Sequence, residues 1–195
     1  MFFEDKILPN SFIDELEQVM LANTTPWYFQ SSTTEKKWGY NKIKGEVDSS
    51  QFTHLILWPN QSQSFLWPIV RPVLFFIEKE LDLNVISVHR SKANLLHPKP
   101  HMNKENFHPP HHDGYEENKK ILSALYYVHD SDGDTHFFDK FYPDTPEEMN
   151  IVKKVSPERG KIVVFDAHQY HSSSPPRDNE RRVVLNFVFE LGEDK

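Results

Sequence analysis

A series of short segments with strand character, separated by turns, occupies the C-terminal half of the chain and constrains its fold more than any other feature. Most of these segments are rich in β-branched and aromatic residues, which favour strands. The Asp132-Gly133 pair, between the second and third segments, predicts a hairpin turn. Many short strands joined by turns predict a β-sandwich or barrel. The segments are residues 85–96, 121–128, 135–141, 150–155, 161–165 and 183–189.

Two segments in the N-terminal part predict helices. Residues 10–22 carry apolar side chains at helical spacing, and residues 62–83 repeat this spacing, with Pro68 and Pro72 in the first turns or at a kink. We expect these helices to pack on one sheet. The length of 195 residues suits one domain. The prediction is therefore a single, mainly β domain (residues 1–195), with residues 1–83 as a helical and substrate-mouth extension and residues 84–191 as the core.

Composition and charge exclude several kinds of site and partner. The chain has no cysteine, so disulfides and thiolate metal ligands are excluded, and any metal must be held by histidine and carboxylate. A net charge of -7 argues against a general polyanion binder. The N-terminus lacks the pattern of a secretion signal, and no stretch approaches the roughly 20 apolar residues that a membrane span needs. We therefore expect a soluble, cytoplasmic protein without a membrane partner.

The segment His108-Pro-Pro-His-His-Asp-Gly114 places an imidazole and a carboxylate two residues apart ahead of a predicted strand. Residues i and i+2 of an extended segment share a face, so His111 and Asp113 can reach one metal ion together, whereas His112 points away. The pair His112 with Asp113 is the competing choice. A second histidine from a distant strand would complete a site of two histidines and one carboxylate, which suits non-haem Fe(II) with open coordination positions.

A candidate for this second histidine lies downstream. The strand-like run Gly160-Lys-Ile-Val-Val-Phe165 leads to His168 and His171, and Arg181-Arg182 opens the last predicted strand. With these residues the sequence resembles the 2-oxoglutarate- and Fe(II)-dependent dioxygenases, in particular their prolyl-4-hydroxylase-like group. The shared pattern is His-x-Asp, then a Gly-x-x-x-x-Phe strand leading into the distal histidine, then an arginine. The resemblance covers residues 85–190.

The resemblance implies a double-stranded β-helix (jelly-roll) core in which His111, Asp113 and His171 bind Fe(II). The spacing favours His171 over His168, although both stay open. The family also uses an arginine for the remote carboxylate of 2-oxoglutarate, and a guanidinium suits this task because it binds a carboxylate through two parallel hydrogen bonds. Strand alternation lets only one arginine of the pair point inward, and the spacing favours Arg182 over Arg181.

Three further residues are implied as cosubstrate contacts. Tyr127 corresponds to a tyrosine that hydrogen-bonds the same carboxylate in prolyl hydroxylases, and Ser123 lies on the same face of that strand. Asn94 lies on the strand before the metal motif, where some dioxygenases have Asn-x-Tyr and this chain has Asn94-Leu-Leu96. The implied cofactors are Fe(II), 2-oxoglutarate and O2, with ascorbate as a candidate auxiliary reductant.

The implied reaction hydroxylates an unactivated C–H bond while 2-oxoglutarate is converted to succinate and carbon dioxide. The first expectation for the substrate is a prolyl residue of a peptide or protein, ahead of a nucleic acid or a small molecule. A nucleobase-oxidising enzyme is the alternative of the same class, and it would need a basic groove. A cupin-like metal protein without oxygenase activity is the alternative of another class, and it would not require Arg182. The local lysines available for a basic groove are Lys92, Lys99, Lys104, Lys119 and Lys120.

Overall fold

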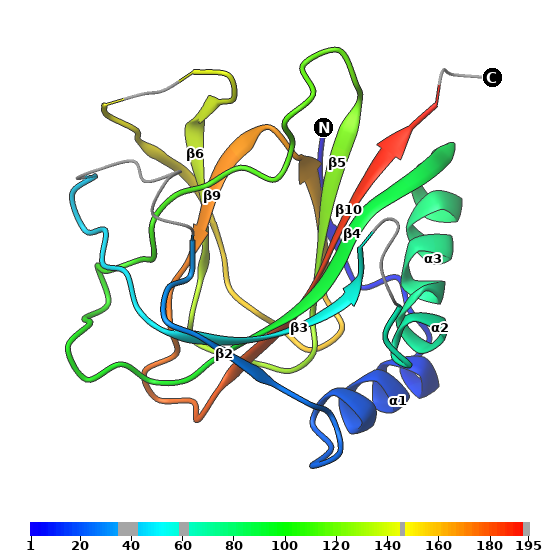
Figure 1. Ribbon diagram of the computed structural model, residues 1–195, viewed down its shortest axis with the longest axis horizontal. Helices are drawn as coiled ribbons and strands as arrows, with labels where there is room; N and C mark the ends of the chain where they lie inside the picture. The colour runs from blue at the N-terminus through cyan, green and yellow to red at the C-terminus, as the bar shows by residue number, and fades with distance from the viewer. Residues whose placement is uncertain (35–42, 59–62, 145–146, 193–195) are drawn as a thin grey trace.

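Two antiparallel sheets face each other, and helices cover the outer face of the larger one (Figure 1). The computed structural model describes residues 1–34, 43–58, 63–144 and 147–192. The strand order is β1-β8-β5-β10-β4-β3-β2 in the larger sheet and β7-β6-β9 in the smaller one. This arrangement confirms the predicted fold class, a mainly β double-stranded β-helix with helices packed on one sheet.

Most strands are short, as the sequence predicts, although β4 has 12 residues and β10 has 10, and neighbouring strands pair antiparallel. Four of them, β1, β2, β3 and β9, lie outside the strand segments that the sequence predicts. Residues 1–83 also contribute three strands to the larger sheet in addition to the predicted helices. The strands are β1 (Phe2–Asp5), β2 (Tyr28–Gln30), β3 (Gln51–Leu57), β4 (Val85–Leu96), β5 (Ile121–Tyr127), β6 (Thr135–Phe141), β7 (Ile151–Val155), β8 (Ile162–Asp166), β9 (Gln169–Ser173) and β10 (Arg182–Leu191).

The turn between β5 and β6 is not the predicted hairpin. Strand β5 pairs with β8 and β10, whereas β6 pairs with β7 and β9, so this turn carries the chain from one sheet to the other. The Asp132 carboxylate accepts hydrogen bonds from the backbone N–H groups of Arg177 and Asp178. A Cβ on Gly133 would lie 2.5 Å from the Ser174 carbonyl oxygen. The Asp-Gly pair therefore marks a crowded crossing between sheets.

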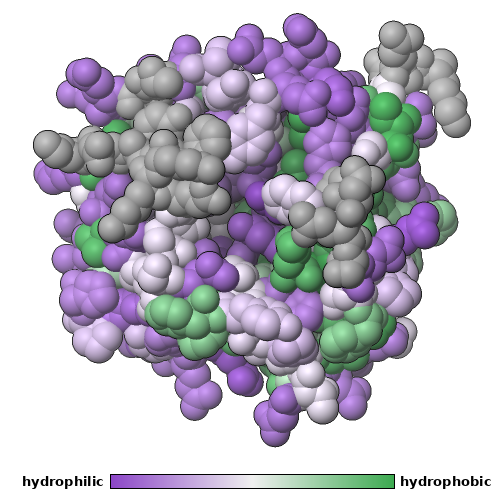
Figure 2. Space-filling model, in the orientation of Figure 1, coloured by the Kyte–Doolittle hydropathy of each residue, from purple (hydrophilic) through white to green (hydrophobic). Residues whose placement is uncertain are grey.

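Three helices in the described residues pack on the larger sheet: α1 (Asn10–Met20), α2 (Trp67–Val70) and α3 (Pro72–Leu81) (Figure 1). The helix predicted for residues 62–83 is thus two helices, and residue 62 lies outside the described residues. Pro68 and Pro72 each stand in a first turn, where a missing N–H breaks no helical hydrogen bond. None of these helices has the length and hydropathy of a membrane span. Polar side chains prevail on the face shown in Figure 2, with smaller hydrophobic patches between them.

Strands β5 and β10 are buried on both faces, which explains their nearly continuous apolar sequences. Leu122 and Phe187 belong to the core under the helices, together with Leu16 of α1. Leu125 and Val184, on the opposite face, belong to the core between the two sheets. Polar residues on this inner face are therefore held inside the molecule, and they mark the region of the site.

We predict that Leu16→Ala destabilises the protein by about 2–5 kcal/mol, because this fully buried side chain fills the space between α1 and the sheet. The measurement is urea-induced unfolding followed by circular dichroism. Gln18→Ala is the control, because Gln18 is exposed on the same helix. Its effect should stay within about 0.5 kcal/mol. An equal decrease in the free energy of unfolding in the two variants would contradict the helix packing described above.

Candidate metal centre

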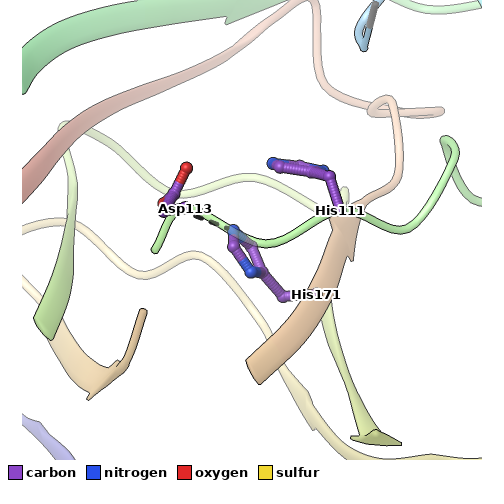
Figure 3. Close-up of side chains that lie close together, drawn as sticks. All are labelled: His111, Asp113 and His171. Atoms are coloured by element: carbon purple, nitrogen blue, oxygen red, sulfur yellow. Dashed lines mark ion pairs between the residues drawn. The ribbon is translucent and has the colours of Figure 1, made fainter. Parts of the chain in front are cut away.

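Three side chains from two segments of the chain converge between the sheets: His111, Asp113 and His171 (Figure 3). Their ligand atoms all lie within 4.8 Å of one another. The distance from His171 Nε2 to Asp113 Oδ2 is 3.6 Å, and the two imidazole centroids are 4.4 Å apart. Two imidazoles and one carboxylate form a donor set that can hold Fe(II) with coordination positions left open.

Backbone pairing brings the two histidines together. His111 lies in the loop before β5, and His171 lies on β9 of the smaller sheet. Each donates its backbone N–H to the carbonyl of the other, with N–O distances of 2.9 and 2.8 Å. The N–H groups of Asp113 and Gly114 both donate to the Ala167 carbonyl at 2.8 Å. The loop with the His-x-Asp motif is thus fastened to the chain between β8 and β9.

The imidazoles are oriented with one nitrogen toward the backbone. His171 Nδ1 lies 3.0 Å from the Gln169 carbonyl oxygen, and His111 Nδ1 lies 3.4 Å from that of Pro109. An Nδ1–H that donates to a carbonyl leaves the Nε2 lone pair for a metal. Burial lowers the pKa of both histidines, and this favours the neutral form that a metal requires.

The carboxylate of Asp113 is buried and has three donors. Arg90 forms an ion pair with Oδ1, while the Ser123 hydroxyl and the Asn186 amide donate to Oδ2 at 2.8 and 3.1 Å. Burial alone would raise the pKa of Asp113, but the charge of Arg90 holds it well below the usual range. The carboxylate is therefore ionised and fixed before any metal binds.

Two of these donors, Arg90 and Asn186, were missed by sequence reasoning. The only signal was a polar residue within an apolar strand, as with Asn186 inside the run Val183–Phe189. Ser123 was expected to contact the cosubstrate, but the structure places its hydroxyl against Asp113. It therefore lies with the carboxylate that can hold the metal.

The competing histidines lie outside the cluster. His112 Nδ1 is 2.7 Å from the Gly114 carbonyl oxygen, and its ring packs on Tyr142 and Tyr170. His168 Nδ1 is 3.0 Å from an Asp166 carboxylate oxygen. The structure thus brings together the three residues that the sequence favoured, and leaves both alternatives aside.

Arg182 is buried at the start of β10, whereas Arg181 is exposed. Its Nε donates to the Gly133 carbonyl and its Nη2 to the Thr135 hydroxyl, both at 2.7 Å. The Tyr127 hydroxyl lies 2.7 Å from the same Thr135 oxygen. Arg182 and Tyr127 are thus joined through one threonine, and the bonds to Gly133 and Thr135 use two of the five N–H donors of the guanidinium.

One pocket connects the two ends of this site. Its lining includes His111 and His171 at one end and Arg182 at the other, and Asn94 lies on its wall. The Asn94 Oδ1 atom is buried and has no hydrogen-bond partner within the described residues. Buried polar atoms are rarely left unpaired, so this amide is suited to a ligand. The imidazoles and the guanidinium in the lining of this pocket match the chemistry of a dicarboxylate that also chelates a metal.

Residues 99–190 match the model of the 2OG-Fe(II) oxygenase superfamily. The matched region contains the metal-binding cluster and the buried arginine. The chain is similar to this superfamily over these residues, which make up slightly less than half of its length. This match and the donor set described above indicate an oxygenase with Fe(II) as its metal and 2-oxoglutarate as its cosubstrate. The match favours the oxygenase over the alternative of a cupin-like protein without oxygenase activity.

Solved structures with the same fold include oxygenases that act on different substrates. A prolyl-4-hydroxylase from Pseudomonas putida is 16% identical, with a TM-score of 0.53 over 97% of this chain and 91% of that one. A prolyl hydroxylase from Trichoplax adhaerens, in complex with a hypoxia inducible factor peptide fragment, is 11% identical. Its TM-score is 0.59 over 98% of this chain and 84% of that one. The epimerase SnoN, in complex with Fe3+, alpha ketoglutarate and nogalamycin RO, is 14% identical, with a TM-score of 0.62 over 97% and 78%. No curated protein matches the sequence of this oxygenase.

We predict that His171→Ala weakens Fe(II) binding to the oxygenase at least about 100-fold, because a directly bound ligand should matter no less than its supporting hydrogen bonds. The measurement is anaerobic titration with Fe(II), followed by calorimetry. His168→Ala is the matched control and should retain the wild-type affinity. A larger loss of Fe(II) affinity in His168→Ala than in His171→Ala would show that His168, and not His171, is the metal ligand.

Proposed function

We propose that this oxygenase hydroxylates an unactivated C–H bond, with His111, Asp113 and His171 holding Fe(II) and Arg182 holding the remote carboxylate of 2-oxoglutarate. The observation that carries the proposal is a pocket whose lining includes both histidines and the buried guanidinium of Arg182. The bound Fe(II), with O2 and 2-oxoglutarate, would supply the oxidising chemistry and release succinate and carbon dioxide.

The side chains of this site would bind the metal and hold its ligands in the right orientation. Arg90, Ser123 and Asn186 hold the Asp113 carboxylate in one position, so the metal would enter a site that is already arranged. The histidines present Nε2 because their Nδ1 atoms face backbone carbonyls. Such supporting hydrogen bonds contribute to metal affinity by fixing the ligands in advance.

Arg182 would orient the cosubstrate. The bonds to Gly133 and Thr135 fix the plane of the guanidinium, and its burial strengthens the attraction for a carboxylate. A Cβ on Gly133 would lie 3.0 Å from Arg182 Cδ, so glycine leaves the space that this position of the arginine needs. Tyr127 would act through Thr135, and Asn94 would offer its amide from the wall of the pocket.

For the substrate, we propose a peptide or protein that is hydroxylated at a prolyl residue. The likeness to two prolyl hydroxylases, one of them with a bound peptide, supports this choice. A nucleic acid is less favoured because few of the lysines considered above are free to form a basic groove. Lys119 is paired with Glu116 and Glu190, and Lys99 donates to Ser50.

We predict that Arg182→Ala weakens 2-oxoglutarate binding by about 30-fold or more, because a buried hydrogen-bonded charge pair would be lost. The measurement is the visible charge-transfer band of the anaerobic complex with Fe(II) and 2-oxoglutarate. Fe(II) binding itself should be retained in this variant, and His111→Ala should abolish the band through loss of the metal.

The matched control is Arg181→Ala, which removes the exposed neighbouring arginine. In this variant the band should reach half its intensity at the same 2-oxoglutarate concentration as in the wild type. A wild-type protein that binds Fe(II) but develops no band with 2-oxoglutarate would contradict the proposed site. If Arg181→Ala raises the 2-oxoglutarate concentration needed for half of the band and Arg182→Ala does not, Arg181 is the cosubstrate contact.

A further inference from the structure

An open groove adjoins the metal pocket and is lined mainly by hydroxyl and amide side chains. Thr33, Gln51 and Lys92 line both cavities, so the groove opens onto the pocket at these residues. Among the described residues that line the groove there are two cations and no carboxylate, although the chain has a net charge of -7. The lining consists of Gln30, Ser31–Thr34, Gln51, Thr53, Leu55, Trp58, Arg90 and Lys92.

The two cations of the groove differ in their partners. Arg90 forms an ion pair with Asp113 and donates to the Asn186 amide oxygen at 3.3 Å. Lys92, two residues along the same strand and on the same face, forms no ion pair or hydrogen bond with any described residue. Its ammonium is therefore the cation of the groove that remains available to a ligand.

The environment of Lys92 makes an anionic ligand favourable. The side chain is half-buried, and burial together with the charge of Arg90 lowers its pKa to about 8, so it is still mostly protonated at neutral pH. A partly desolvated cation without a partner is destabilising, and an incoming anion would offset that cost. Asp48 lies near the groove wall, but its carboxylate accepts hydrogen bonds from Ser32 and Thr33.

The charges of the loaded site leave room for a further anion. Fe(II), Asp113 and 2-oxoglutarate would together carry one negative charge, while Arg90, Arg182 and Lys92 carry three positive charges. The site would therefore retain a net positive charge after the metal and the cosubstrate have bound. Complementary charge at such a position selects among ligands of similar shape.

We propose that the substrate carries an anionic group, a carboxylate or a phosphate, that the Lys92 ammonium binds where the groove meets the metal pocket. This inference rests on the proposed function and specifies its substrate class. The anchored group would hold a neighbouring C–H bond of the substrate beside the metal. For a peptide substrate, the group would be an acidic or phosphorylated residue, or a terminal carboxylate, close to the residue that is hydroxylated.

The test uses three small probes that each carry one methyl group: acetate, methyl phosphate and the uncharged acetamide. The protein is loaded with Mn(II) and saturating 2-oxoglutarate, and methyl proton relaxation is measured by NMR, because the paramagnetic ion relaxes only nuclei near it. Acetate or methyl phosphate should relax about fivefold faster than acetamide, and the faster of the two identifies the source of the anionic group.

Variants of Lys92 connect this effect to the ammonium. Lys92→Met keeps the length of the side chain and should reduce the relaxation by the anions to the level of acetamide, whereas Lys92→Arg should retain it. Lys119→Met is the control, because Lys119 lines a different pocket and is already paired with Glu116 and Glu190. This control should behave like the wild type.

Four outcomes would overturn the inference. Equal relaxation of all three probes, or anion relaxation that survives Lys92→Met, would exclude an anion site at Lys92 and leave the proposed function standing. A loss of 2-oxoglutarate affinity of more than about tenfold in Lys92→Met would instead make Lys92 a contact of the cosubstrate. A wild-type protein that fails to bind Mn(II) together with 2-oxoglutarate would overturn the proposed function and this inference with it.

Discussion

The pair of backbone hydrogen bonds between His111 and His171 is the interaction on which the site depends. It joins the loop that precedes β5 to β9, a strand of the smaller sheet. The imidazoles face each other because their backbones are paired, and the carboxylate of Asp113 follows two residues later. A metal site that needs ligands from two segments sixty residues apart is thus assembled by the same bonding that builds a sheet.

The buried carboxylate of Asp113 is the most demanding group in this arrangement. Removing a carboxylate from water costs several kcal/mol unless charges and hydrogen bonds compensate. Arg90, Ser123 and Asn186 provide this compensation from β4, β5 and β10, which are neighbours in the larger sheet. The register of these three strands therefore places all three donors around a single carboxylate. Polar residues on the inner face of these strands have a definite task, although the same strands are mostly apolar.

Much of the fold and of the metal cluster could be predicted from the sequence, because the signals were local. Strand β10 is apolar on both faces, and His111 and Asp113 stand two residues apart. The missed elements depend on distant partners. Strand β9 contains Gln169–Ser173, whose composition does not favour a strand, and it is extended because β6 and His111 pair with it. The role of Arg90 likewise depends on strand register, which no local pattern reveals.

Arg182 lies at the inner end of the pocket, and Lys92 lies where the pocket meets the groove. These two positions have a kinetic consequence. A cosubstrate that is to reach the buried guanidinium through the groove must pass the place where a substrate would be anchored. A substrate already seated there would obstruct that passage. With the proposed roles of Arg182 and Lys92, 2-oxoglutarate would therefore bind first and the substrate would close the site above it.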